Sequence, residues 1–167
     1  MTLILQSCEG KIPRPEPSET TDLETELQVT AEALLREKLP FHLGSERLEF
    51  NRTLEAIWRL VQLGNQYIDK TTPWALTKNA AKKNRLCTVL YSAAEALRFL
   101  CVAVSPFMPR AAKELSRQLG LNIDFSKPIL ADKLTWGDLA PGSEVVKGNP
   151  LFPRIDPGTP SKQGVNA

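Results

Sequence analysis

One stretch of the sequence places an aromatic ring close to several positive charges. Trp74 is followed by Lys78, Lys82, Lys83 and Arg85. An indole offers a flat face on which an unstacked base can lie, and Lys and Arg hold phosphates. The stretch therefore indicates RNA binding, with Trp74 as the stacking residue and the lysines as candidate phosphate contacts. A tryptophan that follows a helix is more often a core residue, so the stretch alone leaves both roles open.

Residues with the spacing of a catalytic or metal centre are absent from the sequence. The single histidine, His42, is interpreted as a structural residue of a loop. No Gly-x-Gly-x-x-Gly run, Gly-Lys-Ser/Thr phosphate loop or metal-ligand cluster is found. The carboxylates Asp69, Glu95 and Glu114 stand singly and are predicted to be surface charges of helices rather than an acid–base pair. We expect no catalytic residue, no metal and no cofactor in this chain.

Cysteine usage and apolar runs indicate the cellular compartment. Cys8, Cys87 and Cys101 form no Cys-x-x-Cys pair, so neither a disulfide framework nor a zinc site is predicted. Cys87 and Cys101 should share one helical face as small core residues. The sequence shows no secretory signal and no run of the roughly 18 apolar residues that a membrane helix needs. We expect a cytoplasmic protein without a membrane partner.

Charge is distributed unevenly along the chain. The net charge is only +2, but residues 1–50 are acidic and residues 51–167 are basic. A basic later part suits a polyanion such as RNA, because phosphates are met through Lys and Arg. A solvated surface without a partner explains the same charges, and composition alone favours it.

Helical periodicity shows how the chain would position Trp74. A first helix is predicted to begin at the capping box Thr21-Asp22-Leu23-Glu24. A long second helix opens at Glu46, contains Trp58 as a core residue, and ends at Thr71 or Thr72. It ends there because Pro73 lacks an amide hydrogen and biases the preceding residue away from helical geometry. Trp74 is therefore expected on a corner that ends a helix.

Two further helices are predicted over residues 84–104 and 109–119. Since no alternation typical of strands is visible, the fold class is all-α, a bundle of four or five helices with an extended C-terminal arm. Residues 1–17 would hold a truncated first helix and a Pro-rich loop, 18–121 the bundle, 122–156 the arm packed on it, and 157–167 a disordered tail. Trp136 is predicted to fix the arm to the bundle.

Several short runs resemble the anticodon-binding domain of methionyl-tRNA synthetases. They occur in the family's order, at similar spacing, and cover residues 10–156. The runs are Leu54-Glu55-Ala56-Ile57-Trp58, Asn65-Gln66-Tyr67-Ile68-Asp69, Pro73-Trp74-Ala75-Leu76, Glu95-Ala96-Leu97-Arg98, Ser105-Pro106-Phe107-Met108-Pro109, Gln118-Leu119-Gly120, Trp136-Gly137 and Leu151-Phe152-Pro153-Arg154-Ile155. So many runs in order are specific to this family rather than to its relatives for isoleucine, valine, leucine or cysteine.

The resemblance implies a role for Trp74. In the family, the tryptophan of the Pro-Trp pair stacks on an anticodon base, and Trp74 holds that position. The family also reads the anticodon with an Asn and an Arg that would precede the point matching Met1, and these are missing. The ATP-holding motifs His-Ile-Gly-His and Lys-Met-Ser-Lys-Ser are missing as well. The full enzyme joins methionine to its tRNA using ATP, whereas this chain should bind the anticodon loop of tRNA(Met) and be inactive alone.

Two other functions stay open at the level of sequence. The chain could be a helical interaction module that docks to a protein, such as a separate catalytic half in trans. It could also be a truncated fragment whose function exists only in a longer parent. An anticodon hairpin separates the first of these from RNA recognition, because binding through Lys and Arg weakens steeply with salt.

Overall fold

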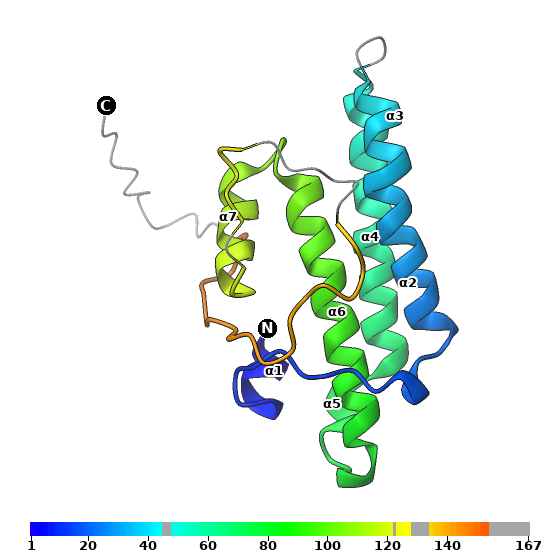
Figure 1. Ribbon diagram of the computed structural model, residues 1–167, viewed down its shortest axis with the longest axis vertical. Helices are drawn as coiled ribbons and strands as arrows, with labels where there is room; N and C mark the ends of the chain where they lie inside the picture. The colour runs from blue at the N-terminus through cyan, green and yellow to red at the C-terminus, as the bar shows by residue number, and fades with distance from the viewer. Residues whose placement is uncertain (45–47, 122, 128–133, 154–167) are drawn as a thin grey trace, which may run out of the picture.

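The computed structural model describes residues 1–44, 48–121, 123–127 and 134–153 (Figure 1). Among these residues one isolated bridge, Lys11 to Glu144, is the only extended pairing. The predicted all-α fold class is confirmed. The α-helices are α1 (Thr2–Ser7), α2 (Asp22–Ala33), α3 (Leu39–Leu43), α4 (Phe50–Thr71), α5 (Pro73–Leu76), α6 (Lys83–Val104) and α7 (Pro109–Gln118). Short 3-10 helices are η1 (Pro17–Glu19) and η3 (Ala80–Lys82), and a π-helical turn, η2 (Leu34–Lys38), joins α2 to α3.

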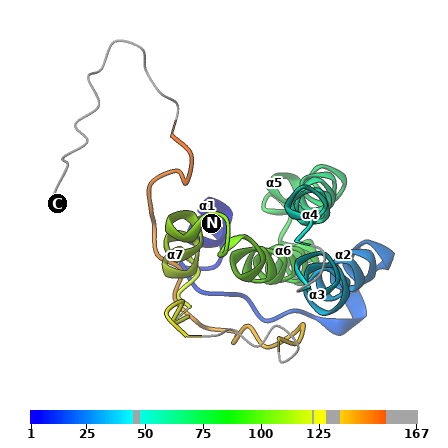
Figure 2. The same cartoon turned by 90° about the horizontal axis from the view of Figure 1, so that it is seen from above.

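Helix α6 forms the centre of the bundle, with α2 and α4 on one side and α7 on the other (Figures 1 and 2). Its residues Phe99 and Cys101 are fully buried, whereas Cys87, predicted on the same core face, is only half-buried. The sequence predicts no apolar run of membrane length, yet Ala80–Val104 has the length and hydropathy of one. Since 78% of its apolar window is buried inside the bundle, α6 is a core helix.

Helix α2 begins at the predicted capping box. The Thr21 side chain accepts a hydrogen bond from the Leu23 amide at 3.3 Å, and the Thr21 amide donates to Glu24 Oε2 at 2.8 Å. These bonds satisfy amide groups that lack partners at the start of a helix. The same Glu24 is 3% exposed, so the cap also brings a carboxylate into the core.

Helix α4 begins at Phe50, later than the predicted start at Glu46, which lies outside the described residues. Leu48 adopts a left-handed backbone, with φ 44°, so the chain is not helical there. The Glu49 amide donates to the His42 carbonyl at 2.8 Å, and His42 Nδ1 lies 2.9 Å from Glu49 Oε2. His42 therefore has a structural role, as predicted, because it closes the connection between α3 and α4, but it lies in the last turn of α3 and not in a loop.

The far end of α4 is the predicted corner. The helix ends at Thr71, and Thr72 turns into the left-handed region with φ 42° and ψ 58°. Pro73 then starts α5, where its missing amide hydrogen costs nothing. The Thr72 carbonyl accepts from the Ala75 amide at 2.8 Å. A left-handed conformation costs a residue with a Cβ on the order of 1–3 kcal/mol, so the surrounding contacts must hold the corner.

The described part of the C-terminal arm is bound by a buried carboxylate. Glu95, predicted as a surface charge, is fully buried. Its Oε1 accepts from the amides of Gly137 at 3.0 Å and Leu139 at 2.7 Å. Arg98 donates to Glu95 Oε2 at 2.8 Å, and the Trp136 ring lies 5.7 Å from that of Phe99. The prediction for Glu95 was wrong because a charge can enter an apolar helix face when it meets amides and a cation there.

Candidate RNA-binding surface

Trp74 is presented at the corner between α4 and α5. Pro73 is buried, while the following Trp74 is 48% exposed. Thr77 Oγ1 donates to the Trp74 carbonyl at 2.8 Å, which holds the backbone after the corner. The backbone that carries the indole is therefore held in place, and the ring is accessible. Trp74 is not the core residue that its position after a helix, taken alone, favoured.

A groove of about 530 Å³ lies beside Trp74. Its walls come from α1, the corner and the start of α6, and its polar side chains include Gln6, Asn79 and Lys83. Asn79 Oδ1 accepts from the Ala81 amide at 3.0 Å, which orients the Asn79 side chain. Sequence reasoning missed Gln6 and Asn79, because only the packing of α1 beside the corner brings these distant residues together.

The structure distributes the three predicted lysines around the corner. All three are exposed. Lys83 lines the groove with Trp74, and Lys82 lines a neighbouring hollow of about 880 Å³ together with Lys70. Lys78 lies on the turn after α5. Lys83 therefore places a positive charge in the groove of the indole, whereas Lys82 faces the neighbouring hollow with Lys70, which the sequence did not single out.

Arg85, which ends the basic stretch, binds groups of the protein itself instead of facing the groove. It donates to the Glu19 carbonyl at 2.6 Å and lies 2.8 Å from Glu24 Oε1. The Tyr67 hydroxyl donates to the same oxygen of Glu24. Burial raises the pKa of the Glu24 carboxyl, but hydrogen bonds from Arg85, Thr21 and Tyr67 outweigh it and hold that pKa below its ordinary value. The resulting ionised cluster joins α2, α4 and α6 beneath the corner.

Within the run from Asn65 to Asp69, Tyr67 has a structural role. It is buried, and burial together with its bond to Glu24 raises the pKa of its phenol well above the ordinary value. Thr71 Oγ1 donates to the Tyr67 carbonyl at 2.7 Å, one turn before the corner. The cluster therefore supports the last turn of α4, from which Trp74 is presented.

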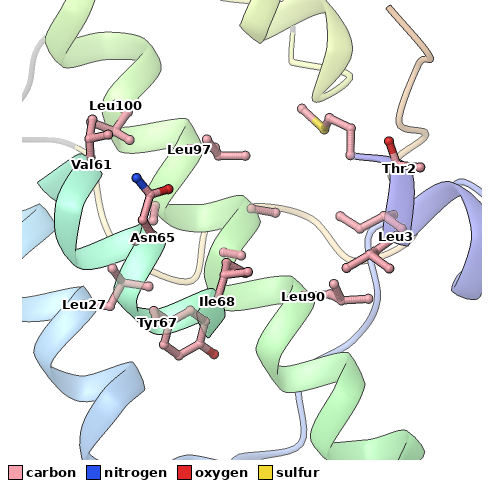
Figure 3. A pocket seen from close by; sticks show the side chains of 16 residues that line it. Thr2, Leu3, Leu27, Val61, Asn65, Tyr67, Ile68, Leu90, Leu97 and Leu100 are labelled. Carbon is pink, nitrogen blue, oxygen red and sulfur yellow. The ribbon is translucent and has the colours of Figure 1, made fainter. Parts of the chain in front are cut away.

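A second hollow, of about 410 Å³, lies between α1, α4 and α6 (Figure 3). Leucine, isoleucine and valine side chains dominate its wall, and Asn65 contributes an amide that points into it (Figure 3). No charged side chain lines this hollow. It therefore offers no Lys or Arg side chain to an RNA backbone, in contrast to the groove beside Trp74, which has Lys83.

Trp58 differs from its prediction. It is 51% exposed on the surface of α4, beside Leu54 and Gln62. Ile57 and Leu60 are fully buried, so the buried face of α4 runs through these residues. Neighbours in a helix point about 100° apart, which turns Trp58 away from the core. An apolar stripe therefore predicted the helix correctly and the burial of this side chain wrongly.

Fold and surface together define the class of this protein as an all-helical domain that presents an exposed indole at a rigid corner. The family model of the anticodon binding domain of methionyl tRNA ligase matches residues 14–161. The chain belongs to this family. The match includes the corner, the groove residue Asn79 and the buried Glu24 and Glu95.

Known relatives agree with the family assignment. The methionine–tRNA ligase of Caldanaerobacter subterraneus is 38% identical over 156 residues, which are 93% of this chain and 23% of that protein. That of Clostridium tetani is 42% identical over 117 residues, 66% of this chain and 17% of that protein. The apo crystal structure of Mycobacterium tuberculosis methionyl-tRNA synthetase aligns with a TM-score of 0.78 at 28% identity, covering 93% of this chain and 30% of that one. The chain thus spans under a third of the length of these relatives.

Proposed function

We propose that this domain recognises the anticodon loop of tRNA(Met), with Trp74 stacking on one unpaired base. The observation that carries the proposal is the half-exposed indole at a rigid corner, at the position of the family's Pro-Trp pair. Stacking of a base on an aromatic side chain contributes roughly 1–3 kcal/mol. The groove beside the ring gives the stacked nucleotide a place to lie.

The polar residues of the groove suit the remaining parts of a nucleotide. Gln6 and Asn79 carry amides that can hydrogen-bond base edges, and Lys83 carries a charge for a phosphate. Lys78 and Lys82 extend that charge outside the groove. In this proposal Trp74 and the amides select bases, whereas the lysines attract the backbone of any sequence.

Aminoacylation is proposed for the longer parent protein and not for this chain. In a complete methionine–tRNA ligase, this domain would hold the anticodon while a separate domain joins methionine to the tRNA using ATP. The domain itself would need no metal or cofactor and would act in the cytoplasm. Formation of methionyl-tRNA by the purified chain would contradict this division of roles.

The test is binding of a fluorescent anticodon hairpin of initiator tRNA, measured by anisotropy at several salt concentrations. Trp74→Ala should weaken binding by about 5- to 150-fold, which corresponds to the stacking energy. Trp58→Ala is the matched control, because it removes an equally exposed indole from a surface without the groove, and it should change affinity less than about twofold. Equal losses in both variants, with helical content unchanged, would contradict the stacking role.

The salt series also tests the other candidate functions. Binding through the lysines must weaken steeply as salt rises, and each Lys→Ala change should reduce that slope by somewhat less than one. Absence of binding at low salt would favour a helical module that docks to a protein, such as the catalytic domain in trans. Binding regained only within a longer parent would favour a fragment that does not function alone.

A further inference from the structure

A hollow of about 880 Å³, the α2 hollow, lies on the other side of the corner from the groove beside Trp74. Its walls come from η1, the start of α2, the end of α4 and η3. Figure 1 shows α1 and the start of α2 on opposite sides of α5, at the same end of the bundle. Leu76 lines both the groove and the hollow, while Ala80 lines the groove and Ala81 the hollow. The two are therefore adjacent.

Charged side chains of both signs line the α2 hollow. Lys70 and Lys82 come from the end of α4 and from η3, whereas Glu19 and Asp22 come from η1 and the start of α2. Lys70, Lys82 and Asp22 are exposed, and Glu19 is half-buried. Among the described residues, no ion pair involves any of these four side chains. The hollow thus has a basic wall and an acidic wall, and both are available to a ligand.

We propose that the α2 hollow binds a second nucleotide of the same RNA, one whose base carries an exocyclic amino group. The inference rests on the proposed function, because the hollow adjoins the groove of the stacked base. Lysine meets the phosphate of a nucleotide, and a carboxylate accepts a hydrogen bond from the amino group of a base. Adenine, cytosine and guanine have such a group and uracil does not. The acidic wall therefore selects the base, and the basic wall holds the backbone.

The acidic wall distinguishes this ligand from a bare stretch of phosphates. Glu19 and Asp22 repel phosphates, because like charges oppose each other. A base amino group instead uses the same carboxylates as acceptors. Leu23 and Leu76 add apolar surface to the hollow, against which the face of a base can pack. The lining thus has a counterpart for the phosphate, the amino group and the ring of one nucleotide.

The first test removes the negative charge and keeps the size of both side chains. The fluorescent anticodon hairpin is bound to the chain that carries Glu19→Gln and Asp22→Asn together. Its affinity should fall by about 3- to 10-fold, because the carboxylates no longer accept from the base. Glu26→Gln removes an exposed carboxylate of α2 outside the hollow, and it should not weaken binding. Unchanged or stronger binding by the double variant, as expected when negative charge near a polyanion is removed, would overturn the proposal.

The second test identifies the amino group on the RNA. Hairpins are compared in which one loop base at a time loses its exocyclic amino group, for example through purine in place of adenine or hypoxanthine in place of guanine. At one loop position, the loss should weaken binding to the natural chain by about 3- to 10-fold and should have little further effect on the double variant. Equal effects on both chains at every position would exclude a contact between the carboxylates and a base.

The third test concerns the basic wall. Lys70→Ala should lower the affinity and reduce the slope of its salt dependence by somewhat less than one. Lys38→Ala is the matched control, because Lys38 is also exposed but belongs to η2, at the opposite end of α2. Equal slopes for the two variants would exclude a phosphate contact at Lys70.

Trp74→Ala separates this inference from the proposed function. If Trp74→Ala weakens binding and the variants of the hollow do not, the groove binds RNA and the α2 hollow does not. If the natural chain does not bind the hairpin at low salt, both proposals are wrong. Asp22 lies in the first turn of α2, where a negative charge stabilises a helix, so circular dichroism must show that the double variant is folded. Lys70→Ala decides the result if it is not.

Discussion

Glu24 and Glu95 are both buried and both paired with an arginine, yet they bind different kinds of partner. Glu24 is held by side chains of two other helices, Arg85 of α6 and Tyr67 of α4, and by its own cap residue Thr21. Glu95 accepts two amides from the C-terminal arm in addition to its bond with Arg98. One carboxylate joins helices to one another, and the other joins a helix to irregular chain.

This difference follows from where backbone amides find partners. Most backbone amides within α2, α4 and α6 bond inside their own helices, so Glu24 pairs mainly with side chains and accepts a single amide, that of Thr21 at the start of α2. The arm has neither helix nor sheet around Gly137 and Leu139, so its amides need an acceptor from elsewhere. Glu95 supplies that acceptor from the central helix, while Arg98 and Tyr91 of the same helix bind carbonyls of the arm.

Among the substitutions proposed for these buried groups, removal of Glu95 should therefore lower the stability of the fold most. Glu95→Ala leaves Arg98 as a buried, unpaired charge and removes the acceptor of two amides, so we expect a loss of about 3–5 kcal/mol in the free energy of unfolding. Urea denaturation measures it. Glu114→Ala, which breaks the exposed pair with Arg117, is the control and should leave stability unchanged. If Glu95→Ala lowers the free energy of unfolding no more than Glu24→Ala does, the two carboxylates do not differ in the way described.

Removal of Glu24 should have a smaller effect. Arg85 keeps 17% of its side-chain surface exposed, so water can solvate its charge after Glu24→Ala. We expect a loss of about 1.5–3 kcal/mol, in the range of hydrogen bonds to a charged group. Urea denaturation measures it, with Glu95→Ala as the comparison. Unchanged stability would mean that the cluster does not hold the helices together.

Acid offers a separate test of Glu24. The folded-state pKa of Glu24 lies below its ordinary 4.5, so the unfolded chain binds this proton more tightly. The contribution of Glu24 is complete above about pH 4.5 and is lost as pH falls through the folded-state pKa. Glu24→Gln should be less stable at pH 7 and should show a flatter acid profile of unfolding free energy. Parallel profiles for the variant and the natural chain would contradict this assignment.

Tyr91, which binds the C-terminal arm, should have the smallest effect on stability. Its hydroxyl donates to the carbonyls of Gly137 and Leu139, both at 2.9 Å, and burial together with Glu95 raises the pKa of its phenol to about 12. Its contribution is complete below the ordinary value of 10 and is lost as pH rises through about 12. Tyr91→Phe should cost about 1 kcal/mol at pH 7 and should lessen the alkaline loss between pH 10 and 12. An alkaline loss as large as that of the natural chain would exclude Tyr91 as its source.

The sequence predicted the helices better than the burial of individual side chains. The Thr21 cap and the Pro73 corner are local signals, and both appear where they were expected. The environments of Trp58 and Glu95 depend on which neighbour covers each face of a helix, and periodicity does not contain that information. The pairing of Glu95 with Arg98 one turn apart in an apolar helix was the signal that could have identified a buried ion pair.

The groove beside Trp74 could not be predicted from the sequence. Its wall combines Gln6 with Asn79 and Lys83, and only the docking of α1 makes them neighbours. Trp74 was found through its family position, whereas the groove required the structure. Trp74, the proposed stacking residue, could thus be named from sequence, and the polar groups beside it could not.

Thr72 has a consequence for the entropy of recognition. A glycine in its place would adopt the left-handed backbone without strain, but it would also sample many other conformations. Thr72 has few alternatives, and Pro73 fixes its own φ, so two successive residues limit how the chain can bend. An indole held this way has little freedom to lose when a ligand arrives, and a smaller ordering cost leaves more of the stacking energy as affinity.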